Sequence, residues 1–288
     1  MKKLWHLHYA LDLFTLTCNQ FKVTEQSTGE SLKNFTLTKG CLIIADRAYG
    51  TIKSIEHCLA AGRDFIIRIK NKPFHIYEEN GRKLVLSGWL RTVGNTATHL
   101  NVFIRNSEKK LIPVRICACK KTEAEIAAEK TRIRKMESRK QRKLSDETVF
   151  THNYMFVITS LPSEISAAQI LSCYCLRWQV ELVFKRLKSL LGLGSIPTKT
   201  KEAGQTWING KILLSLLTEK YLGDIDFPPL GTFEANRSIW RETKLVSFII
   251  FMMILPNIQM MSLDILKLVK ITFIEKRKHT RQQLLRFL

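Results

Sequence analysis

The chain has 288 residues, of which 46 are Lys or Arg and 25 are Asp or Glu, so its formal net charge at pH 7 is +21. With 45% hydrophobic and 9% aromatic residues it can form a packed core, which excludes a disordered basic tail. A positive excess of this size repels itself, and a polyanionic partner is the simplest reason for a folded protein to carry it.

The positive charge is concentrated in two segments. Residues 120–143 contain ten Lys or Arg and four Glu, and residues 265–288 contain seven and one, so each segment has a net charge of +6. Neither segment has the aromatic-rich apolar face of a helix that binds a membrane surface, which favours nucleic acid as the polyanion. No stretch reaches the roughly 18 apolar residues of a membrane span, and no secretory signal is expected at the amino terminus.

The first apolar patterns predict strands. Residues 5–13 alternate apolar and polar side chains, and a second β run follows a predicted turn at 18–20. The continuous apolar run 41–45 predicts a strand that is buried on both faces, with the carboxylate of Asp46 emerging at its carboxyl end.

A helix and a further strand follow. Residues 51–61 predict a helix that ends at Gly62, and residues 65–69 predict the next strand. The order of three strands, a helix and a strand predicts an α/β fold, with a mixed sheet and covering helices.

The sequence changes character near residue 73. Short β runs alternate with turns that contain Gly and Asn, and the basic helix 120–143 has so few apolar residues that we expect it to be solvated. A buried strand resumes at 154–159, so residues 73–149 are interpreted as a β-rich insertion within the domain. The β runs of this insertion are 84–86, 102–104 and 114–119.

The carboxyl-terminal part is predicted to be helical. The stretch 163–169, with Ser, Ser and Gln at capping positions, predicts the start of a helix that runs to about Leu191. A second apolar helix is expected over 208–222, followed by a loop over 223–238 and a mainly helical tail.

The seven cysteines predict reduced thiols. The pairs Cys117/Cys119 and Cys173/Cys175 lie within apolar stretches and have a single intervening residue, whereas structural zinc sites usually have roughly two to four. We therefore expect core thiols in a cytoplasmic protein.

Four polar residues of the long predicted helix share one face. At roughly 100° per residue they fall within a sector of about 60°, opposite an apolar face. They are Tyr174, Arg177, Glu181 and Lys188. Taken alone, the pattern fits a surface helix with an ion pair between Arg177 and Glu181 equally well.

The spacing and identity of these four residues resemble the Tyr-Arg-Glu-Lys signature of the insertion-sequence-4 family of bacterial transposases, whose catalytic acids are Asp, Asp and Glu. Residues 46–50, which read Asp-Arg-Ala-Tyr-Gly after an apolar strand, look like that family's segment around its second catalytic Asp. The resemblance covers about residues 4–222, and a β-rich insertion between the acids is also a family feature. It implies a cut-and-paste transposase that cleaves and joins DNA in the bacterial or archaeal cytoplasm, where it would associate with the nucleoid.

The resemblance also implies a site. A ribonuclease-H-like fold would hold two Mg²⁺ ions on two Asp and one Glu, and Mn²⁺ would be able to replace Mg²⁺. Asp46 and Glu181 would be catalytic metal ligands, since hard oxygen donors suit Mg²⁺. Trp178 is expected to pack in the core rather than to stack on a base. The phosphates of the DNA backbone would be bound by Tyr174, Arg177 and Lys188.

The implied partner is double-stranded DNA, at transposon inverted-repeat ends and at the target, bound by a homodimer without any membrane. The expected domain organisation follows the same resemblance. It comprises 1–72 as the first part of the catalytic domain, 73–149 as the insertion with its basic helix, 150–222 as the second part with the signature helix, and 223–288 as a basic helical region.

The family's first catalytic Asp lies on a strand that would precede residue 5, so we expect an amino-terminally truncated copy with impaired catalysis. Asp12 is a poor replacement because it belongs to the following strand, and His6 and His8 are better interpreted as hydrogen-bonded strand residues. The alternative function is a non-catalytic DNA- or RNA-binding protein, or an inhibitor that forms mixed complexes with a full-length transposase. No G-x-S-x-G or G-x-x-x-x-G-K-[ST] pattern occurs, so neither a serine hydrolase nor an ATPase is expected.

Overall fold

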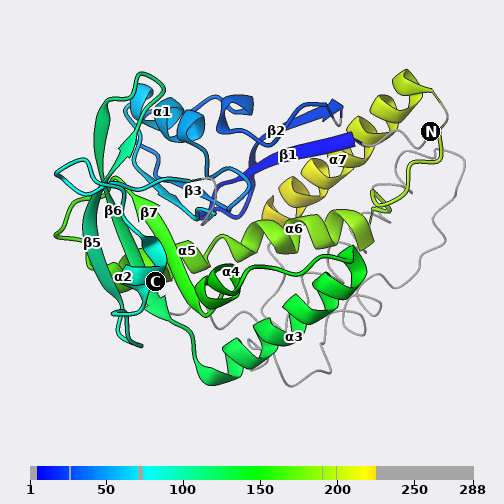
Figure 1. Cartoon of the computed structure of the whole chain (residues 1–288). Helices are drawn as coiled ribbons and strands as arrows, with labels where there is room; N and C mark the ends of the chain where they lie inside the picture. Colours follow the sequence, from blue (N-terminus) through cyan, green and yellow to red (C-terminus); the bar gives the residue numbers. More distant parts are fainter. Residues whose placement is uncertain (1–4, 26, 71–73, 190, 199, 225–288) are drawn as a thin grey trace, which may run out of the picture. The chain divides into compact units, whose positions relative to one another are not determined.

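The computed structural model describes residues 5–25, 27–70, 74–189, 191–198 and 200–224. The chain divides into two compact units, a larger one that contains Asn19–Gln179 and a smaller one that resumes at Val180. The elements in chain order (Figure 1) are β1 (Trp5–Leu11), β2 (Cys18–Glu25), the 3₁₀ helix η1 (Leu32–Asn34), β3 (Ile43–Ala45), α1 (Ile52–Ala60), β4 (Phe65–Ile67), α2 (Leu86–Leu90), β5 (Thr98–Arg105), β6 (Leu111–Lys120), α3 (Glu123–Lys140), α4 (Asp146–Thr151), β7 (Tyr154–Thr159), α5 (Ala167–Cys175), α6 (Trp178–Ser189) and α7 (Lys201–Asp224).

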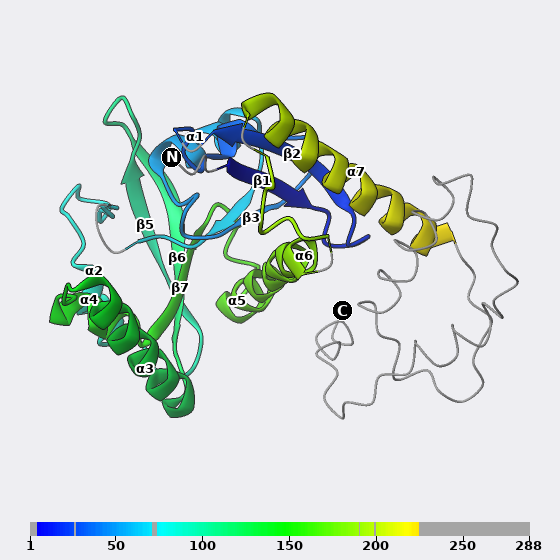
Figure 2. The ribbon, with the colours of Figure 1, turned by 90° about the vertical axis from the view of Figure 1, so that its right-hand side faces the viewer.

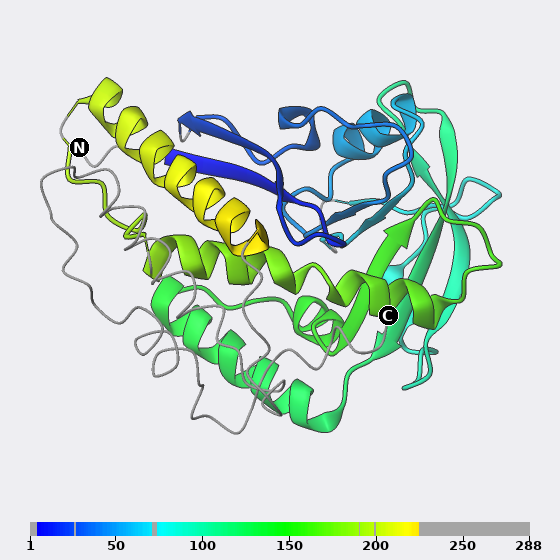
Figure 3. The same ribbon diagram turned by 180° about the vertical axis from the view of Figure 1, so that it is seen from behind.

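A mixed five-stranded sheet forms the centre of the larger unit, in the order β3-β4-β7-β6-β5. β3 and β4 are parallel, whereas each of the other three pairs is antiparallel. The predicted mixed sheet is thus confirmed. β1 and β2 pair with each other in a separate two-stranded sheet, seen as two blue arrows in Figure 3. β2 begins at Cys18 itself, so the turn predicted at 18–20 is wrong.

The strands expected in the insertion belong to this same sheet. β5 pairs with β6 along its whole length, and β6 pairs with β7, so that Lys120 lies beside Tyr154. The strand predicted at 84–86 is wrong, because Leu86 begins the short helix α2. Helical geometry puts Leu86 and Leu90, four residues apart, on one face, and both side chains are buried in the core.

The two faces of the sheet carry separate apolar clusters, because successive side chains of a strand point to opposite sides. In β4, Ile66 packs with Ile170 of α5, while Phe65 and Ile67 pack in the cluster that contains Ile55 of α1. Each of these five side chains is fully buried, and burial of such a side chain contributes roughly 1.5–3 kcal/mol to stability. Strand β4 is therefore packed between α5 on one face of the sheet and α1 on the other.

The basic helix α3 lies on the surface of the larger unit, as its sequence predicts. Its start has a capping box, in which the Thr122 hydroxyl accepts from the Glu125 amide and the Glu125 carboxylate accepts from the Thr122 amide. Ile126 and Ile133 are the buried residues of the helix. In Figure 2, α2, α3 and α4 gather at one end of the sheet.

The single helix predicted from 163 to about Leu191 is interrupted. α5 begins after Ser166, which forms a capping box with Gln169, and ends at Cys175; α6 begins at Trp178. Between them the Arg177 amide donates to the Tyr174 carbonyl at 3.1 Å, a bond to the third residue back instead of the fourth. Such bonds tighten the chain and end the α-helical ladder. Neither proline nor glycine marks this position in the sequence.

The helix predicted at 208–222 lies within α7 of the smaller unit, where Ile208 and Ile212 are buried. The tail beyond residue 224, including the basic segment 265–288, lies outside the described residues. Among the helices that are described, none combines the length and apolarity required to cross a membrane.

The seven cysteines are free thiols, but only some of them lie in the core. Cys58 and Cys117 are buried, and burial raises the pKa of each thiol to about 11. Cys41 and Cys175 are exposed, so the expectation of core thiols is wrong for these two.

Candidate active site

Asp46 lies directly after β3, at the edge of the sheet where the parallel strands β3 and β4 both end. The register pairs Ala45 with Ile67, and the amide of Arg68 donates to the Ala45 carbonyl at 3.2 Å. Asp46 and Arg68 are therefore neighbours on adjacent strand ends. The predicted position of Asp46 is confirmed, although β3 is shorter than expected and its residues Ile43 and Ile44 are only half-buried.

A tight turn fixes the Asp46 carboxylate. Its Oδ1 accepts a hydrogen bond from the Ala48 amide at 2.7 Å, and its carbonyl oxygen accepts from the Tyr49 amide at 3.2 Å. Such side-chain-to-backbone bonds are typical of Asp in turns. Asp46 is half-buried in this turn, and its Oδ1 is held in place by the backbone.

Gly50 allows this turn to lie against β4. A Cβ atom built at this position would lie 2.4 Å from the carbonyl oxygen of Arg68. Real Cβ atoms do not approach backbone oxygen so closely, so only glycine fits without a shift of the backbone. The close approach of this turn to β4 therefore explains why residue 50 is a glycine.

Tyr174 reaches the same region from α5. Its side chain is 2% exposed and packs with Ile170 and Leu171 on the buried face of the helix. The prediction that it shares an open face with Glu181 is wrong, because the projection assumed one continuous helix through the turn at Leu176–Arg177.

The electrostatic environment of Tyr174 connects it to Asp46. Burial raises the pKa of the Tyr174 hydroxyl, the charges of Arg177 and Arg68 oppose this shift, and the charge of Asp46 adds to it. The guanidinium carbon of Arg177 lies 5.6 Å from the centre of the Tyr174 ring. One carboxylate, one phenol and two guanidinium groups therefore share this corner of the larger unit.

Arg68 is the residue that the sequence pattern missed. Burial lowers its pKa, and the neighbouring positive charges of Arg47 and Arg177 add to the effect. We call Arg47, Arg68 and Arg177 the arginine cluster. A signal existed in the sequence, since Arg68 follows a buried strand that is the next one after the strand of Asp46. The carboxyl ends of adjacent parallel strands meet at one edge, where binding groups commonly lie.

Glu181 and Lys188 lie in the smaller unit, on α6. Both side chains are exposed, Glu181 in the first turn of the helix and Lys188 in the last, an arrangement that also suits the helix dipole. That Glu181 and Lys188 lie close to Asp46 remains a prediction. Trp178, the first residue of α6, is 42% exposed, so the expectation that it packs in the core is wrong.

The candidate metal ligands have the chemistry that a hard divalent cation requires, because Asp46 and Glu181 both offer carboxylate oxygen. In the part of the chain that is described, however, no three His, Cys, Asp or Glu side chains gather into a metal-binding group.

The amino-terminal histidines are engaged in hydrogen bonds, as predicted. His8 is 1% exposed, and its Nε2 lies 2.9 Å from the Thr24 hydroxyl. His6 contacts the carbonyl oxygen of Thr28 at 3.0 Å through Nδ1. Asp12 follows the end of β1 rather than lying within a strand.

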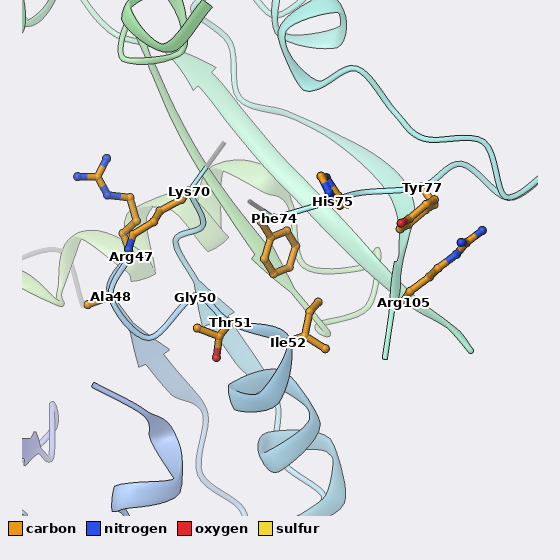
Figure 4. A pocket seen from close by; sticks show the side chains of 10 residues that line it. All are labelled: Arg47, Ala48, Gly50, Thr51, Ile52, Lys70, Phe74, His75, Tyr77 and Arg105. Atoms are coloured by element: carbon orange, nitrogen blue, oxygen red, sulfur yellow. The ribbon is translucent and has the colours of Figure 1, made fainter. Parts of the chain in front are cut away.

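A cavity of about 340 Å³ adjoins the Asp46–Gly50 turn (Figure 4). The Phe74 ring faces its centre, and at the far end the Arg105 guanidinium stacks on Tyr77, 4.3 Å from the ring centre. Cations beside aromatic rings are the usual components of sites for unpaired nucleotides. The lining residues are Arg47, Ala48, Gly50, Thr51, Ile52, Lys70, Phe74, His75, Tyr77 and Arg105.

Comparison with known proteins identifies relatives. Residues 6–217 match the family described as transposase DDE domain. Over 233 residues the chain is 33% identical to the putative transposase InsL for insertion sequence element IS186A of Escherichia coli strain K12 and to the transposase for insertion sequence element IS421 of Escherichia coli. It is 24% identical over 200 residues to the transposase for insertion sequence element IS231F of Bacillus thuringiensis subsp. israelensis.

The alignments cover only part of each protein. Those with the two Escherichia coli relatives cover 78% of this chain and 63% of each relative, and the alignment with the Bacillus thuringiensis relative covers 63% and 42%. The chain thus spans less than two thirds of the length of these relatives. The family match includes Asp46 and every residue of the Tyr-Arg-Glu-Lys pattern. The chain belongs to the family of transposase DDE domains.

Proposed function

We propose that this chain acts as an insertion-sequence DNA transposase of the cut-and-paste type, with a Mg²⁺-dependent transfer of phosphoryl groups at transposon-end DNA. The observation that carries the proposal is the position of Asp46, whose carboxylate is fixed at Oδ1 and lies in a corner that it shares with the guanidinium groups of Arg68 and Arg177. A carboxylate that holds a cation beside groups that hold phosphate is the combination that this chemistry requires.

Asp46 and Glu181 are the proposed metal ligands, and Mn²⁺ is expected to replace Mg²⁺. The bound ions would activate the attacking oxygen and stabilise the leaving oxygen at phosphorus. The turn at Ala48 keeps one Asp46 oxygen occupied, so this side chain offers a fixed donor instead of a mobile one.

In this proposal, positively charged side chains bind the phosphates of the DNA. Arg177 would hold a phosphate through two parallel hydrogen bonds, and Lys188 would act as a point charge. The hydroxyl of Tyr174 is buried, so a direct phosphate contact requires movement; we propose instead that Tyr174 positions Arg177, whose guanidinium lies over its ring. A ribonuclease-H-like arrangement and a homodimer that pairs two inverted-repeat ends belong to the same proposal.

The test is strand cleavage of a linear DNA that carries the inverted repeat of the element, with Mg²⁺ or Mn²⁺, resolved on a denaturing gel. We expect Asp46→Asn and Glu181→Gln each to reduce cleavage by at least about a hundredfold, as for loss of a principal electrostatic group. Glu164→Gln is the matched control, because Glu164 is an exposed acid outside the site. Cleavage that survives both active-site variants would overturn the assignment of these ligands.

A second function is favoured by one observation, the exposed cations along α3. A non-catalytic DNA- or RNA-binding protein, or an inhibitor of a full-length transposase, would use such a surface without any metal. Steeply salt-dependent binding that is unchanged in Asp46→Asn and Glu181→Gln, together with no cleavage by the wild-type chain, would support this alternative.

A further inference from the structure

A second and larger cavity lies within the larger unit, on the other side of Arg47 and Lys70, which line both cavities. Its volume is about 500 Å³, within the roughly 300–1,000 Å³ that small-ligand sites occupy. We call it the cationic cavity. Its lining residues are Arg47, Arg68, Ile69, Lys70, Arg132, Ile133, Met136, Arg139, Leu144, Thr148, Thr151, His152 and Phe156.

The lining contains five permanently charged cations and no carboxylate. Two acids of α3 contact residues of the lining: Oε1 of Glu129 lies 2.7 Å from Nη2 of Arg132 and 2.6 Å from Nδ1 of His152, and Oε1 of Glu137 accepts from the Leu144 amide at 2.6 Å. The Lys121 ammonium, which donates to the His152 carbonyl at 2.8 Å, adds a further positive charge nearby. The cations of the lining therefore outnumber the two carboxylates that contact it.

This excess is costly where it is desolvated. The pKa of Arg68 is lowered by burial, and the charges of Arg47 and Arg177 lower it further. Like charges at a partly buried position repel each other, and burial removes the water that would screen them. A bound anion would relieve both effects, which makes the cationic cavity an anion site that the fold itself maintains.

One wall of the cavity is apolar. Ile133 and Phe156 are buried side chains, and Met136 and Leu144 are half-buried beside them. An inorganic anion gains no binding energy from an apolar surface, whereas the sugar and base of a nucleotide can pack against it. Charge on one side and an apolar wall on the other fit a phosphate ester that carries a ring.

We propose that the cationic cavity binds one nucleotide unit, with its phosphate against Arg68, Arg132 and Arg139 and its base and sugar against the apolar wall. The ligand is either a nucleotide at an unpaired end of a DNA strand or a free nucleotide. This inference rests on the proposed function for DNA as the source of the nucleotide, but the charge and the size of the cavity stand without it.

The first experiment measures binding without chemistry. Fluorescence anisotropy of a labelled ten-nucleotide oligothymidylate, in EDTA, reports affinity for wild type, Arg139→Gln and Arg134→Gln. Both arginines are exposed on α3, but only Arg139 lines the cavity, so the two variants lose the same charge from the same helix. We expect Arg139→Gln to weaken binding about tenfold, the loss of a charge-assisted hydrogen bond, and Arg134→Gln to weaken it no more than about twofold. Equal losses would overturn the proposal.

The second experiment tests the apolar wall. Thymidine triphosphate and inorganic triphosphate compete with the labelled oligonucleotide, and we expect the nucleotide to compete at about tenfold lower concentration because it also buries its ring. Equal potency would overturn the assignment of a nucleotide. Tighter binding of the oligonucleotide than of thymidine triphosphate supports a DNA strand as the ligand, and the reverse supports a free nucleotide.

These outcomes are independent of the proposed transposase activity. Binding is scored in EDTA and not by cleavage, so a chain that cuts no DNA can still distinguish Arg139 from Arg134. Conversely, an active transposase in which the two variants bind alike retains its function and lacks the site proposed here.

Discussion

The position of Asp46 depends on a neighbour that makes no contact with its carboxylate. Gly50 closes the turn that begins at Asp46 and lets the chain approach β4, where the carbonyl oxygen of Arg68 occupies the space of a Cβ atom. The parallel register of β3 and β4, which pairs Ala45 with Ile67, places Arg68 beside Asp46. A carboxylate and a cation are thus held together through the backbone, which resists displacement better than two flexible side chains would.

The change Gly50→Ala tests this dependence. Because its Cβ atom would lie 2.4 Å from a backbone oxygen, we expect the free energy of unfolding to fall by about 1–3 kcal/mol, as for other overpacked sites. Urea denaturation followed by circular dichroism measures the loss. Gly94→Ala is the control, since a Cβ atom at Gly94 meets nothing within 4 Å. Equal stability of the two variants would show that the turn can move away from β4 at no cost.

Helix α5 shows which parts of an element the sequence reveals. Its start could be predicted, because Ser166 and Gln169 form a capping box that depends on residues three apart. Its end at Cys175 could not, because the tight turn at Leu176–Arg177 has no proline or glycine to announce it. Because the sequence projection treated α5 and α6 as one helix, it placed Tyr174 on an open face, whereas the structure buries this side chain.

From the sequence alone, either Ser163 or Ser166 could cap the start of α5, and substitution of each serine tests which one does. Ser166→Ala removes the hydroxyl that accepts from the Gln169 amide at 3.3 Å, and we expect a loss of about 1 kcal/mol in the free energy of unfolding. Ser163→Ala, at an exposed position before the helix, should leave stability unchanged within about 0.5 kcal/mol. Thermal or urea unfolding distinguishes the two, and a larger loss for Ser163→Ala would move the cap to that residue.

Helix α3 is linked to the end of α4 by the contact between Glu129 and His152, the C-cap residue of α4. Burial lowers the pKa of His152 below 6.5, although the hydrogen bond and the charge of Glu129 raise it and the charges of Arg47 and Lys121 lower it. The pKa of Glu129 is also lowered: burial raises it, but the hydrogen bonds from His152 and Arg132 outweigh burial. Both groups bind protons more readily in the unfolded chain. The free energy of unfolding should therefore fall as the pH drops below about 6.5, and fall further below about 4.5.

The variant Glu129→Gln isolates the carboxylate. It removes a charge that raises the pKa of His152, so we expect the midpoint of His152 titration in a two-dimensional NMR spectrum to move to still lower pH. Glu123→Gln, an exposed acid on the same helix, should leave that midpoint where it is in the wild type. An upward shift in Glu129→Gln would mean that the Glu129 carboxylate does not raise the pKa of His152.

At the scale of the whole molecule, local patterns predicted elements better than their pairing. The strand at 154–159 and the helix after Thr51 were confirmed, because each depends on the periodicity or caps of its own residues; the strand predicted at 65–69 also forms, but it ends at Ile67. The sheet order was not predictable, since β4 pairs with β7, which follows it by some ninety residues. Asp46 could be predicted from a strand end, whereas Arg68 needed the parallel register of two strands.

The net charge of +21 is the whole-molecule feature with the most direct consequence, because phosphate contacts make DNA binding depend on salt. Lys135 of α3 and Arg142 just after it are exposed, whereas Lys33 and Lys53 lie beside the Glu56 carboxylate, whose pKa their charges help to lower after the hydrogen bonds from Ser107. Cations that already face an acid release fewer counterions when DNA binds. We therefore expect the two groups to differ in their contribution to DNA affinity.

Two double variants of equal charge measure this difference. For Lys135→Gln with Arg142→Gln, on and just after α3, we expect the slope of log affinity against log salt, measured on a duplex of arbitrary sequence, to become shallower by up to about 1.8, or about 0.9 for each lost phosphate contact. For Lys33→Gln with Lys53→Gln we expect a change below about 0.5, because Glu56 already offsets these charges. Equal slopes in the two variants would mean that DNA is held by the total charge and not by the α3 surface, and the basic segment 120–143 would then lose its assigned role in binding.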